Sequence, residues 1–303
     1  MPSRVRVVVP ASTANLGPGL GCLGLALGLY NTIELATSAG DAGVQMEITG
    51  EGTKAARAAW GDLIARAALS VWQAASQRPG ALQIKAHNEI PLQAGLGANA
   101  AAAISGLAGA NALLGESLSR SDLLRLARRL TGRSANAAAA FFGGLTMVSV
   151  KDAEVRCQSL ETSLHDVVAV LPQVQFTAEI VNGIVPGRVL LADAMFHAER
   201  TAFVIQALRR GDFELLRWAM DDRVQLPFVQ KHVTGYEAVA QAAQEQGAAI
   251  ALSGDGPGLI ALAPEGHEEI ASAMKAAFAR AGVDSQTFVL PVDRQGVQIS
   301  VSG

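Results

Sequence analysis

Residues 91–103 read PLQAGLGANAAAA, a loop with two glycines that runs directly into an alanine-rich helix predicted over residues 100–114. Gly95 and Gly97 allow a tight turn and the close approach of a ligand to the backbone. The N-terminus of the following helix presents unpaired N–H groups and the positive end of its dipole, a combination that binds phosphate. The stretch therefore predicts either a phosphate-binding loop or an ordinary turn before a buried helix.

Composition limits the classes of protein to which the chain can belong. Its 303 residues suit one large domain or two of ordinary size. Half of the residues are hydrophobic and only 5% are aromatic, so the core must consist mostly of Ala, Val and Leu. The net charge is −3 and the chain has no run of Lys and Arg, which argues against nucleic acid as a partner. Cys22 and Cys157 match neither a disulfide framework nor a metal-binding spacing.

The chain also lacks the sequence features of a membrane or secreted protein. No uncharged apolar segment is long enough to cross a membrane. The first residues, MPSRVR, lead directly into a β-branched segment and do not resemble a signal peptide. We therefore expect a soluble, cytoplasmic protein whose ligand is a small molecule.

Apolar patterning predicts strands and helices along the whole chain. Residues 10–24 hold four glycines and two prolines and are interpreted as a loop. Ser119 and Asp122 form a capping-box pattern at the start of a helix that Gly132 ends. The expected strands are 5–9, 29–37, 145–150, 166–171, 248–252, 259–262 and two at the end, and the other expected helices are 63–75, 191–209, 213–223, 234–246 and 266–281.

Strands and helices are mixed rather than strictly alternating. This order favours an α+β fold over a doubly wound parallel sheet. The pattern changes near residue 151, which predicts two domains, 1–150 and 151–303. Since no low-complexity linker separates them, we expect the two domains to pack closely.

Three segments, in this order, resemble the three motifs of the GHMP small-molecule kinases. They are residues 10–19, PASTANLGPG, then residues 91–103, and then residues 252–258, LSGDGPG. Residues 15–27 and 131–136 resemble the homoserine kinases more specifically. The resemblance implies a two-domain fold, an N-terminal α/β domain and a ferredoxin-like C-terminal α/β domain, with ATP and Mg²⁺ bound between them. It also implies phosphorylation of the homoserine hydroxyl, a step in threonine biosynthesis.

The resemblance assigns a role to each matched position. The nucleotide and its phosphates are expected at Asp62, Gly95, Leu96, Gly97, Ala98, Asn99 and Ala100. The substrate pocket is expected to include Ser12, Asn15, Gly21, Asn136, Val181, Val229, Ser253 and Gly254. Asn99 and Thr131 stand at the positions that bind Mg²⁺ in the family.

Several of these positions depart from the family pattern. Thr131 stands where the family carries the glutamate that binds Mg²⁺, and Ala98 and Asn99 replace two serines. Mg²⁺ prefers carboxylate oxygens, so a neutral threonine holds the cation less well than a glutamate does. Gly21 replaces an aspartate that holds the substrate. These departures predict that homoserine kinase activity is weak or lost.

Charged residues around the expected substrate also differ from the family. Arginines that bind the substrate carboxylate are absent near Val181 and Val229, so an amino acid would lack a fixed bidentate partner. Asp255 is a candidate general base or metal ligand, or alternatively a turn aspartate. Arg133 is a candidate to bind a phosphate or a carboxylate, or alternatively a solvated residue after a helix end. Trp60, in a segment interpreted as a loop over residues 54–62, is expected either to stack on adenine or to fill a pocket.

Three functional hypotheses stay open on these residues. The chain is an ATP-dependent kinase of the homoserine kinase family with an altered site, or a scaffold whose emptied pocket, through drift or redesign, serves another ligand or reaction. The third hypothesis is a non-catalytic protein that binds a nucleotide or metabolite. All three place a small molecule in the cleft between residues 91–103 and 253–258, and the resemblance makes a homodimer the expected assembly.

Overall fold

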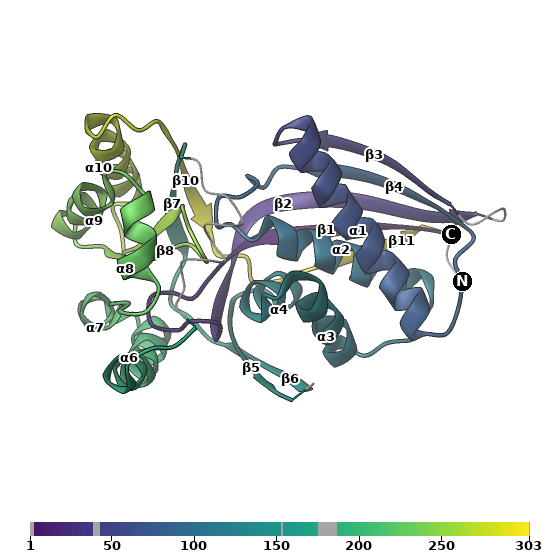
Figure 1. Ribbon diagram of the computed structural model, residues 1–303, viewed down its shortest axis with the longest axis horizontal. Coiled ribbons are helices and arrows are strands. Elements are labelled where there is room, and N and C mark those ends of the chain that lie inside the picture. Colours follow the sequence, from purple (N-terminus) through teal and green to yellow (C-terminus); the bar gives the residue numbers. More distant parts are fainter. Residues whose placement is uncertain (1–2, 39–42, 153, 175–186, 303) are drawn as a thin grey trace.

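The chain folds into two units, each built on its own β-sheet (Figure 1). The computed structural model describes residues 3–38, 43–152, 154–174 and 187–302. Within these residues the first sheet has seven strands and the second has four. The two units meet where β1 and β2 reach toward the second sheet (Figure 1).

The first sheet is built around the long antiparallel pair β1 and β2. Its main strand order is β11-β1-β2-β4-β3, in which β3 runs parallel to β4, and β5 pairs with the start of β2 and with β6. The strands are β1 Arg4–Ala14, β2 Leu23–Ser38, β3 Val44–Gly50, β4 Ala81–Asn88, β5 Leu145–Lys151, β6 Glu154–Leu160 and β11 Gln298–Ser302.

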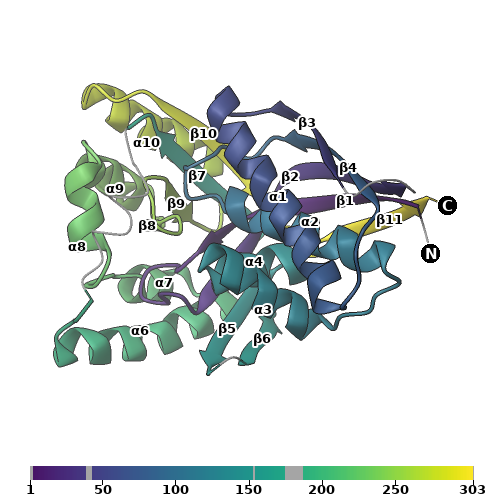
Figure 2. The same ribbon diagram turned by 45° about the vertical axis from the view of Figure 1, so that its right-hand side comes forward.

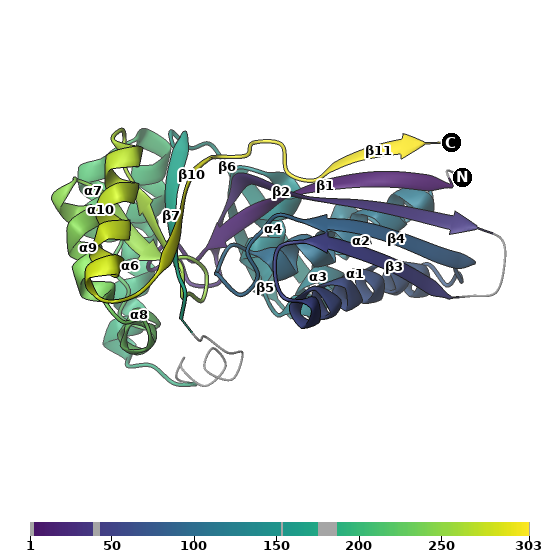
Figure 3. The same cartoon turned by 90° about the horizontal axis from the view of Figure 1, so that it is seen from above.

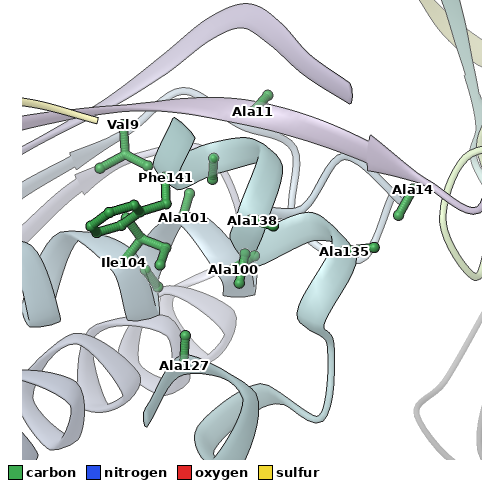
Figure 4. Packing of buried hydrophobic residues seen from close by; sticks show 14 of the residues in the cluster. Val9, Ala11, Ala14, Ala100, Ala101, Ile104, Ala127, Ala135, Ala138 and Phe141 are labelled. Carbon is green, nitrogen blue, oxygen red and sulfur yellow. The ribbon is translucent and has the colours of Figure 1, made fainter. Parts of the chain in front are cut away.

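Four helices cover one face of this sheet (Figure 3). They are α1 Lys54–Ala74, α2 Ala98–Leu113, α3 Arg120–Thr131 and α4 Ser134–Phe142. Nearly every residue of α2 is buried, as expected for a helix that is hydrophobic on all sides. Small side chains let the layers approach closely, and Figure 4 shows the side chain of Val9 on β1 directed toward α2 and α4, which carry Ala101 and Ala138.

The second unit follows a ferredoxin-like order of elements. Its antiparallel sheet has the order β10-β7-β9-β8, which is 4-1-3-2 when these strands are numbered along the chain. Helices α8, α9 and α10 lie on the side of this sheet that faces away from the first unit (Figure 2). The elements are β7 Asp166–Pro172, α6 Leu191–Arg210, α7 Phe213–Ala219, α8 Leu226–Val229, the 3₁₀ helix η1 Gln230–His232, α9 Tyr236–Glu245, β8 Ala249–Leu252, β9 Leu259–Leu262, α10 His267–Arg280 and β10 Ser285–Pro291. The α+β class and the ferredoxin-like unit are thus confirmed.

Of the predicted loops, the one over residues 10–24 is wrong in part and the one over residues 54–62 is wrong throughout. Residues 10–14 continue strand β1, because a register shift between Pro10 and Ala11 accommodates a proline that has no N–H for the ladder. Residues 54–62 belong to helix α1, since Thr53 caps the helix by accepting a hydrogen bond from the N–H of Ala56 at 3.2 Å. The capping box of Ser119 and the helix end at Gly132 are confirmed.

The two sheets do not divide at residue 150. Strand β6 pairs with β5, and β11 at the end of the chain pairs with β1, so both strands belong to the first sheet. The chain therefore enters the second unit and returns, which brings both of its ends to one end of the first sheet. Among the described helices, none combines the length and the apolar character that a membrane crossing requires.

Candidate functional site

Two adjoining cavities lie where the two units meet. The larger cavity, about 630 Å³, is bordered by the loop after β1 and by the turn between α3 and α4. The smaller cavity, about 360 Å³, is bordered by residues 93–100 and is called here the loop cavity. Thr131, Arg133, Asn136 and Asp255 line both cavities, so the two form a single cleft.

The glycines of the 91–103 loop are required by close contacts from both units. Gly97 and Gly95 have left-handed φ angles of 72° and 85°. A Cβ atom at Gly97 would collide with the Ser12 hydroxyl, and one at Gly95 would collide with the carbonyl oxygen of Ser253. Ser12 N donates to Leu96 O at 3.1 Å, and Ser253 Oγ donates to Gly95 O at 2.9 Å. Strand β1 and the loop after β8 therefore both hold this loop in place.

The loop leads into an uncapped helix N-terminus. Gly97 is the N-cap of α2 and contributes no side-chain hydrogen bond, and the first intrahelical bond runs from Ala101 N to Gly97 O at 2.9 Å. Ala98, Asn99 and Ala100 precede that bond and line the loop cavity. Their N–H groups and the helix dipole make this end of the cleft suitable for an anion.

Trp60 supports the loop from inside the protein. Its side chain is buried in the first core, and its indole Nε1 donates to Ala98 O at 3.1 Å. Trp60 lines neither cavity. Of the two expectations for this residue, adenine stacking is therefore not supported, and Trp60 instead packs beneath the start of α2.

Asn15 and Asn136 connect the segments that border the cleft. Asn15 Nδ2 donates to Gly254 O at 2.8 Å and to Gln225 Oε1 at 3.0 Å, and Asn15 Oδ1 accepts from Gly21 N at 3.0 Å. Asn136 Nδ2 donates to the hydroxyl and carbonyl oxygens of Ser12, both at 3.2 Å. The two asparagines thus hold the cleft together rather than standing free in it.

Arg133 and Asp255 form an ion pair between the two units. Asp255 Oδ1 also accepts a hydrogen bond from Gln225 Nε2 at 3.2 Å. Their side chains are 43% and 23% exposed, so the pair is half-buried rather than free in solvent. Among the described residues, Asp255 is the only acidic residue that lines either cavity.

The oxygen atoms near the loop do not fit a Mg²⁺ site. Thr131 Oγ1 donates to Ala127 O at 2.9 Å and accepts from Arg133 N at 3.1 Å, so its hydroxyl is occupied by the backbone. Asp255 is paired with Arg133, and Asn99 offers only a neutral amide. No group of three His, Cys, Asp or Glu side chains suited to a metal occurs in the described parts of the chain. Since Mg²⁺ prefers carboxylate and phosphate oxygens, these residues do not form a Mg²⁺ site by themselves, whereas the N–H groups at the start of α2 suit an anion.

The structure brings most of the predicted site residues together. Asp62 does not join them: it lies exposed on α1 and pairs with Arg66 at 2.9 Å. Val229 is buried in the second core and lines neither cavity, and Val181 lies outside the described residues. Those at or directly behind the cleft are Ser12, Asn15, Gly21, Gly95, Leu96, Gly97, Ala98, Asn99, Ala100, Thr131, Arg133, Asn136, Ser253, Gly254 and Asp255.

Gln225 and Arg128 line the larger cavity but were missed from the sequence. Gln225 belongs to none of the three motifs, and its place depends on Asp222. Asp222 Oδ1 accepts the N–H groups of Val224 and Gln225, both at 2.8 Å, and lies 3.3 Å from His197 Nε2. Burial raises the pKa of the Asp222 carboxyl. Arg128 lies near the end of α3. Only this helical spacing could have indicated from the sequence that its side chain lines the cavity.

Both parts of the chain match known protein families. The GHMP kinases N terminal domain matches residues 62–144, and the GHMP kinases C terminal domain matches residues 204–280. The homoserine kinase of Moorella thermoacetica is 39% identical over 281 residues, which is 91% of this chain and 93% of that protein. A homoserine kinase from Synechococcus sp. (strain CC9902) is 36% identical over 97% of this chain and 95% of its own length. The chain belongs to the homoserine kinase family of the GHMP kinases.

Solved structures show the same fold. The homoserine kinase of Cytophaga hutchinsonii superimposes with a TM-score of 0.88 at 24% identity, over 99% of this chain and 98% of that chain. A putative homoserine kinase from Listeria monocytogenes gives a TM-score of 0.75 at 25% identity, over 98% of this chain and its whole length. Membership of the GHMP kinases implies the use of ATP, usually with Mg²⁺.

Proposed function

We propose that this member of the homoserine kinase family binds the phosphates of ATP in the loop cavity and phosphorylates homoserine far more slowly than its relatives. One observation carries the proposal: the loop cavity joins an intact, uncapped N-terminus of α2 to a lining with no unpaired carboxylate among the described residues. The uncapped helix N-terminus favours the binding of a phosphate, and the lack of an unpaired carboxylate disfavours the binding of the Mg²⁺ that normally accompanies it.

The size of the expected loss follows from how phosphoryl transfer is catalysed. Transfer depends on positioning and on neutralising the charge of the phosphates with a metal and cationic groups. Loss of one major electrostatic element typically lowers the rate by about 10²- to 10³-fold, and losses within one site do not simply add. We therefore expect a turnover no higher than about a thousandth of that of a family member with the full set of ligands.

Calorimetry and a coupled assay test the two halves separately. ATP is titrated into the protein with and without Mg²⁺, and ADP release is followed with homoserine at high protein concentration. The homoserine kinase of Moorella thermoacetica serves as the active comparison. We expect ATP to bind with an affinity that Mg²⁺ barely changes, and turnover near background. The proposal is wrong if ATP does not bind at millimolar concentration, or if turnover comes within tenfold of the comparison enzyme.

A second experiment restores the family residues. The variant combines Thr131→Glu, Ala98→Ser, Asn99→Ser and Gly21→Asp. No atom lies within 4 Å of the position of a Cβ at Gly21, and aspartate tolerates the left-handed φ of 68° there better than most residues do. We expect Mg²⁺ to strengthen ATP binding in this variant and turnover to rise at least tenfold. The matched control carries Thr131→Gln in place of Thr131→Glu, which keeps the shape but not the charge. Equal behaviour of the two variants would contradict the assignment of position 131.

The second candidate function is non-catalytic binding of a small anionic metabolite, in a pocket that no longer serves a kinase. Arg128 and Arg133 both line the larger cavity, and this observation favours the candidate. Thermal unfolding is measured with a panel of organic phosphates and carboxylates in the absence of ATP. Stabilisation by one of these compounds, with no turnover in the restored variant, would favour binding over slow catalysis.

A further inference from the structure

The Arg133–Asp255 ion pair lies at the point where the two cavities meet. Arg133 is the N-cap of α4 and directly follows Gly132, which ends α3 in the first unit. Asp255 belongs to the second unit, in the loop between β8 and β9. Both side chains line both cavities, so a ligand that spans the cleft must pass beside this pair.

The loop that carries Asp255 is held by its backbone, whereas the carboxylate is held only by side chains. Gly254 N donates to Ala14 O at 3.1 Å, and Gly256 N donates to Ser253 O at 2.9 Å. The carboxylate of Asp255 contacts the guanidinium of Arg133 and the amide of Gln225. Asp255 can therefore leave Arg133 by rotating its side chain, with no change in the loop.

The partners of Asp255 are those that an oxyanion ligand would use. A guanidinium and a side-chain amide are donors that bind carboxylates and phosphates alike. The lining of the cleft holds two arginines, Arg128 and Arg133, against a single acidic residue among the described ones. In the structure the Asp255 carboxylate pairs with Arg133 and neutralises its charge.

We infer that Asp255 is an internal counterion that occupies Arg133 until a phosphate group of the ligand displaces it. The inference rests on the proposed binding of phosphate in the loop cavity and adds a competitor to it. Arg133 then contributes to ligand affinity only after its bond to Asp255 is broken. The Asp255 carboxylate therefore lowers the affinity of the cleft for phosphate below the value that a free Arg133 would give.

The Asp255→Asn variant removes the charge and keeps the size of the side chain. Binding of inorganic phosphate and of ATP is measured by calorimetry at low and moderate salt, without Mg²⁺. We expect the Kd for both to fall about three- to tenfold, as for the loss of a half-buried ionic competitor. Arg133→Gln is expected to weaken binding by a similar factor. In the Arg133→Gln background the effect of Asp255→Asn should be smaller, because only the direct repulsion between the carboxylate and the phosphate remains.

A matched pair of exposed charges controls for the change in net charge. Glu47 and Lys85 lie 3.7 Å apart on β3 and β4, and both are 68% exposed. Glu47→Gln and Lys85→Gln change the net charge as the two test variants do, so their phosphate affinity should match the wild type. Thermal unfolding of each variant confirms that it is folded.

The outcomes separate this inference from the proposed function. If wild type and Asp255→Asn both fail to bind phosphate and ATP, the proposed function and the inference are both wrong. If the wild type binds and Asp255→Asn binds equally or more weakly, only the inference is overturned. Weaker ATP binding by Asp255→Asn in the presence of Mg²⁺ alone would show Asp255 to be a metal ligand and would also overturn it. An unchanged effect of Asp255→Asn in the Arg133→Gln background would exclude competition for Arg133.

Discussion

The side-chain amide of Asn15 donates a 2.8 Å hydrogen bond to the carbonyl oxygen of Gly254, and so joins the loop after β1 to the loop after β8. These loops belong to the first and the third glycine motifs, which lie at opposite ends of the sequence. The backbone of Asn15 has a φ of 75°, a left-handed conformation that asparagine tolerates better than most residues. The Asn15 side chain thus adds to the backbone bond from Gly254 N to Ala14 O in fixing the two walls of the cleft relative to each other.

Replacement of Asn15 is expected to destabilise the protein. Asn15→Ala loses three hydrogen bonds and places a Cβ-bearing residue without polar compensation in left-handed backbone, at a cost of about 2–4 kcal/mol in the free energy of unfolding. Urea denaturation measures the change. Asn15→Gly removes the same bonds without the backbone strain and should cost about 1 kcal/mol less. Equal losses in the two variants would show that backbone strain contributes nothing.

The glycine at position 97 is expected to be required for space as well as for its backbone angle. Gly97→Ala combines a φ of 72° with a collision against the Ser12 hydroxyl. Gly115 has a φ of 70° and no neighbouring atom within 4 Å of its Cβ position, so Gly115→Ala tests the angle alone. We expect about 1–2 kcal/mol for Gly115→Ala and at least 1–3 kcal/mol more for Gly97→Ala. Phosphate affinity, measured in parallel, should fall only for Gly97→Ala; a fall in both variants would contradict the local explanation.

Trp60 is expected to influence the cleft without touching it. Trp60→Phe removes the hydrogen bond to Ala98 O and leaves a small cavity, at an expected cost of about 1–3 kcal/mol. It should also weaken phosphate binding two- to fivefold, about 0.4–1 kcal/mol, because the start of α2 loses support. Trp72→Phe, a buried tryptophan further along α1, is the matched control and should lower stability but leave affinity unchanged. Unfolding curves and phosphate titrations of both variants test these expectations. Equal phosphate affinity of Trp60→Phe and Trp72→Phe would refute the coupling between Trp60 and the cleft.

The Cys157 thiol is expected to react slowly at neutral pH. Burial raises its pKa from 9.0 to about 11. Alkylation by iodoacetamide should therefore accelerate about tenfold per pH unit up to about pH 11, whereas the thiol of the unfolded chain should level off near its ordinary pKa. The folded pKa is the higher one, so the contribution of this thiol to stability is complete below pH 9 and declines as the pH rises through about 11. A Cys22→Ala background isolates the signal of Cys157, and a plateau near pH 9 in the folded protein would contradict the prediction.

Local signals explain what could be predicted. Ser119 and Asp122 form a capping box through contacts three residues apart, and Gly132 ends the helix through its own φ of 70°. The glycines of the 91–103 loop likewise identify a turn before a helix. The start of α1 was missed because its cap at Thr53 has no acidic partner in the first turn to mark it. The extension of β1 past Pro10 was missed because a bulge absorbs the proline, and a bulge depends on the partner strand.

The roles of the individual site residues were harder to predict from the sequence. The sequence identified most residues of the cleft through the three motifs and through residues 15–27 and 131–136. It did not identify Gln225, whose N–H is held by the Asp222 carboxylate. Asp255 and Arg133 each have two interpretations in the sequence, and the ion pair between them could not be predicted from either residue alone. The sequence alone leaves Thr131 as a weak metal ligand, whereas in the structure its hydroxyl donates a hydrogen bond to Ala127 O.

The sequence by itself therefore determined most of the helices, the phosphate-loop pattern and the resemblance to one family, because each of these depends on neighbouring residues or on motif spacing. It did not predict strands β3, β4 and β6 or helix α4. Only the tertiary structure decided that Asp255 faces Arg133, that Trp60 lies beneath the loop and that Asn15 joins the two units. These contacts link residues far apart in the chain. Their geometry follows from how the two sheets and their helices pack, and no local pattern encodes that packing.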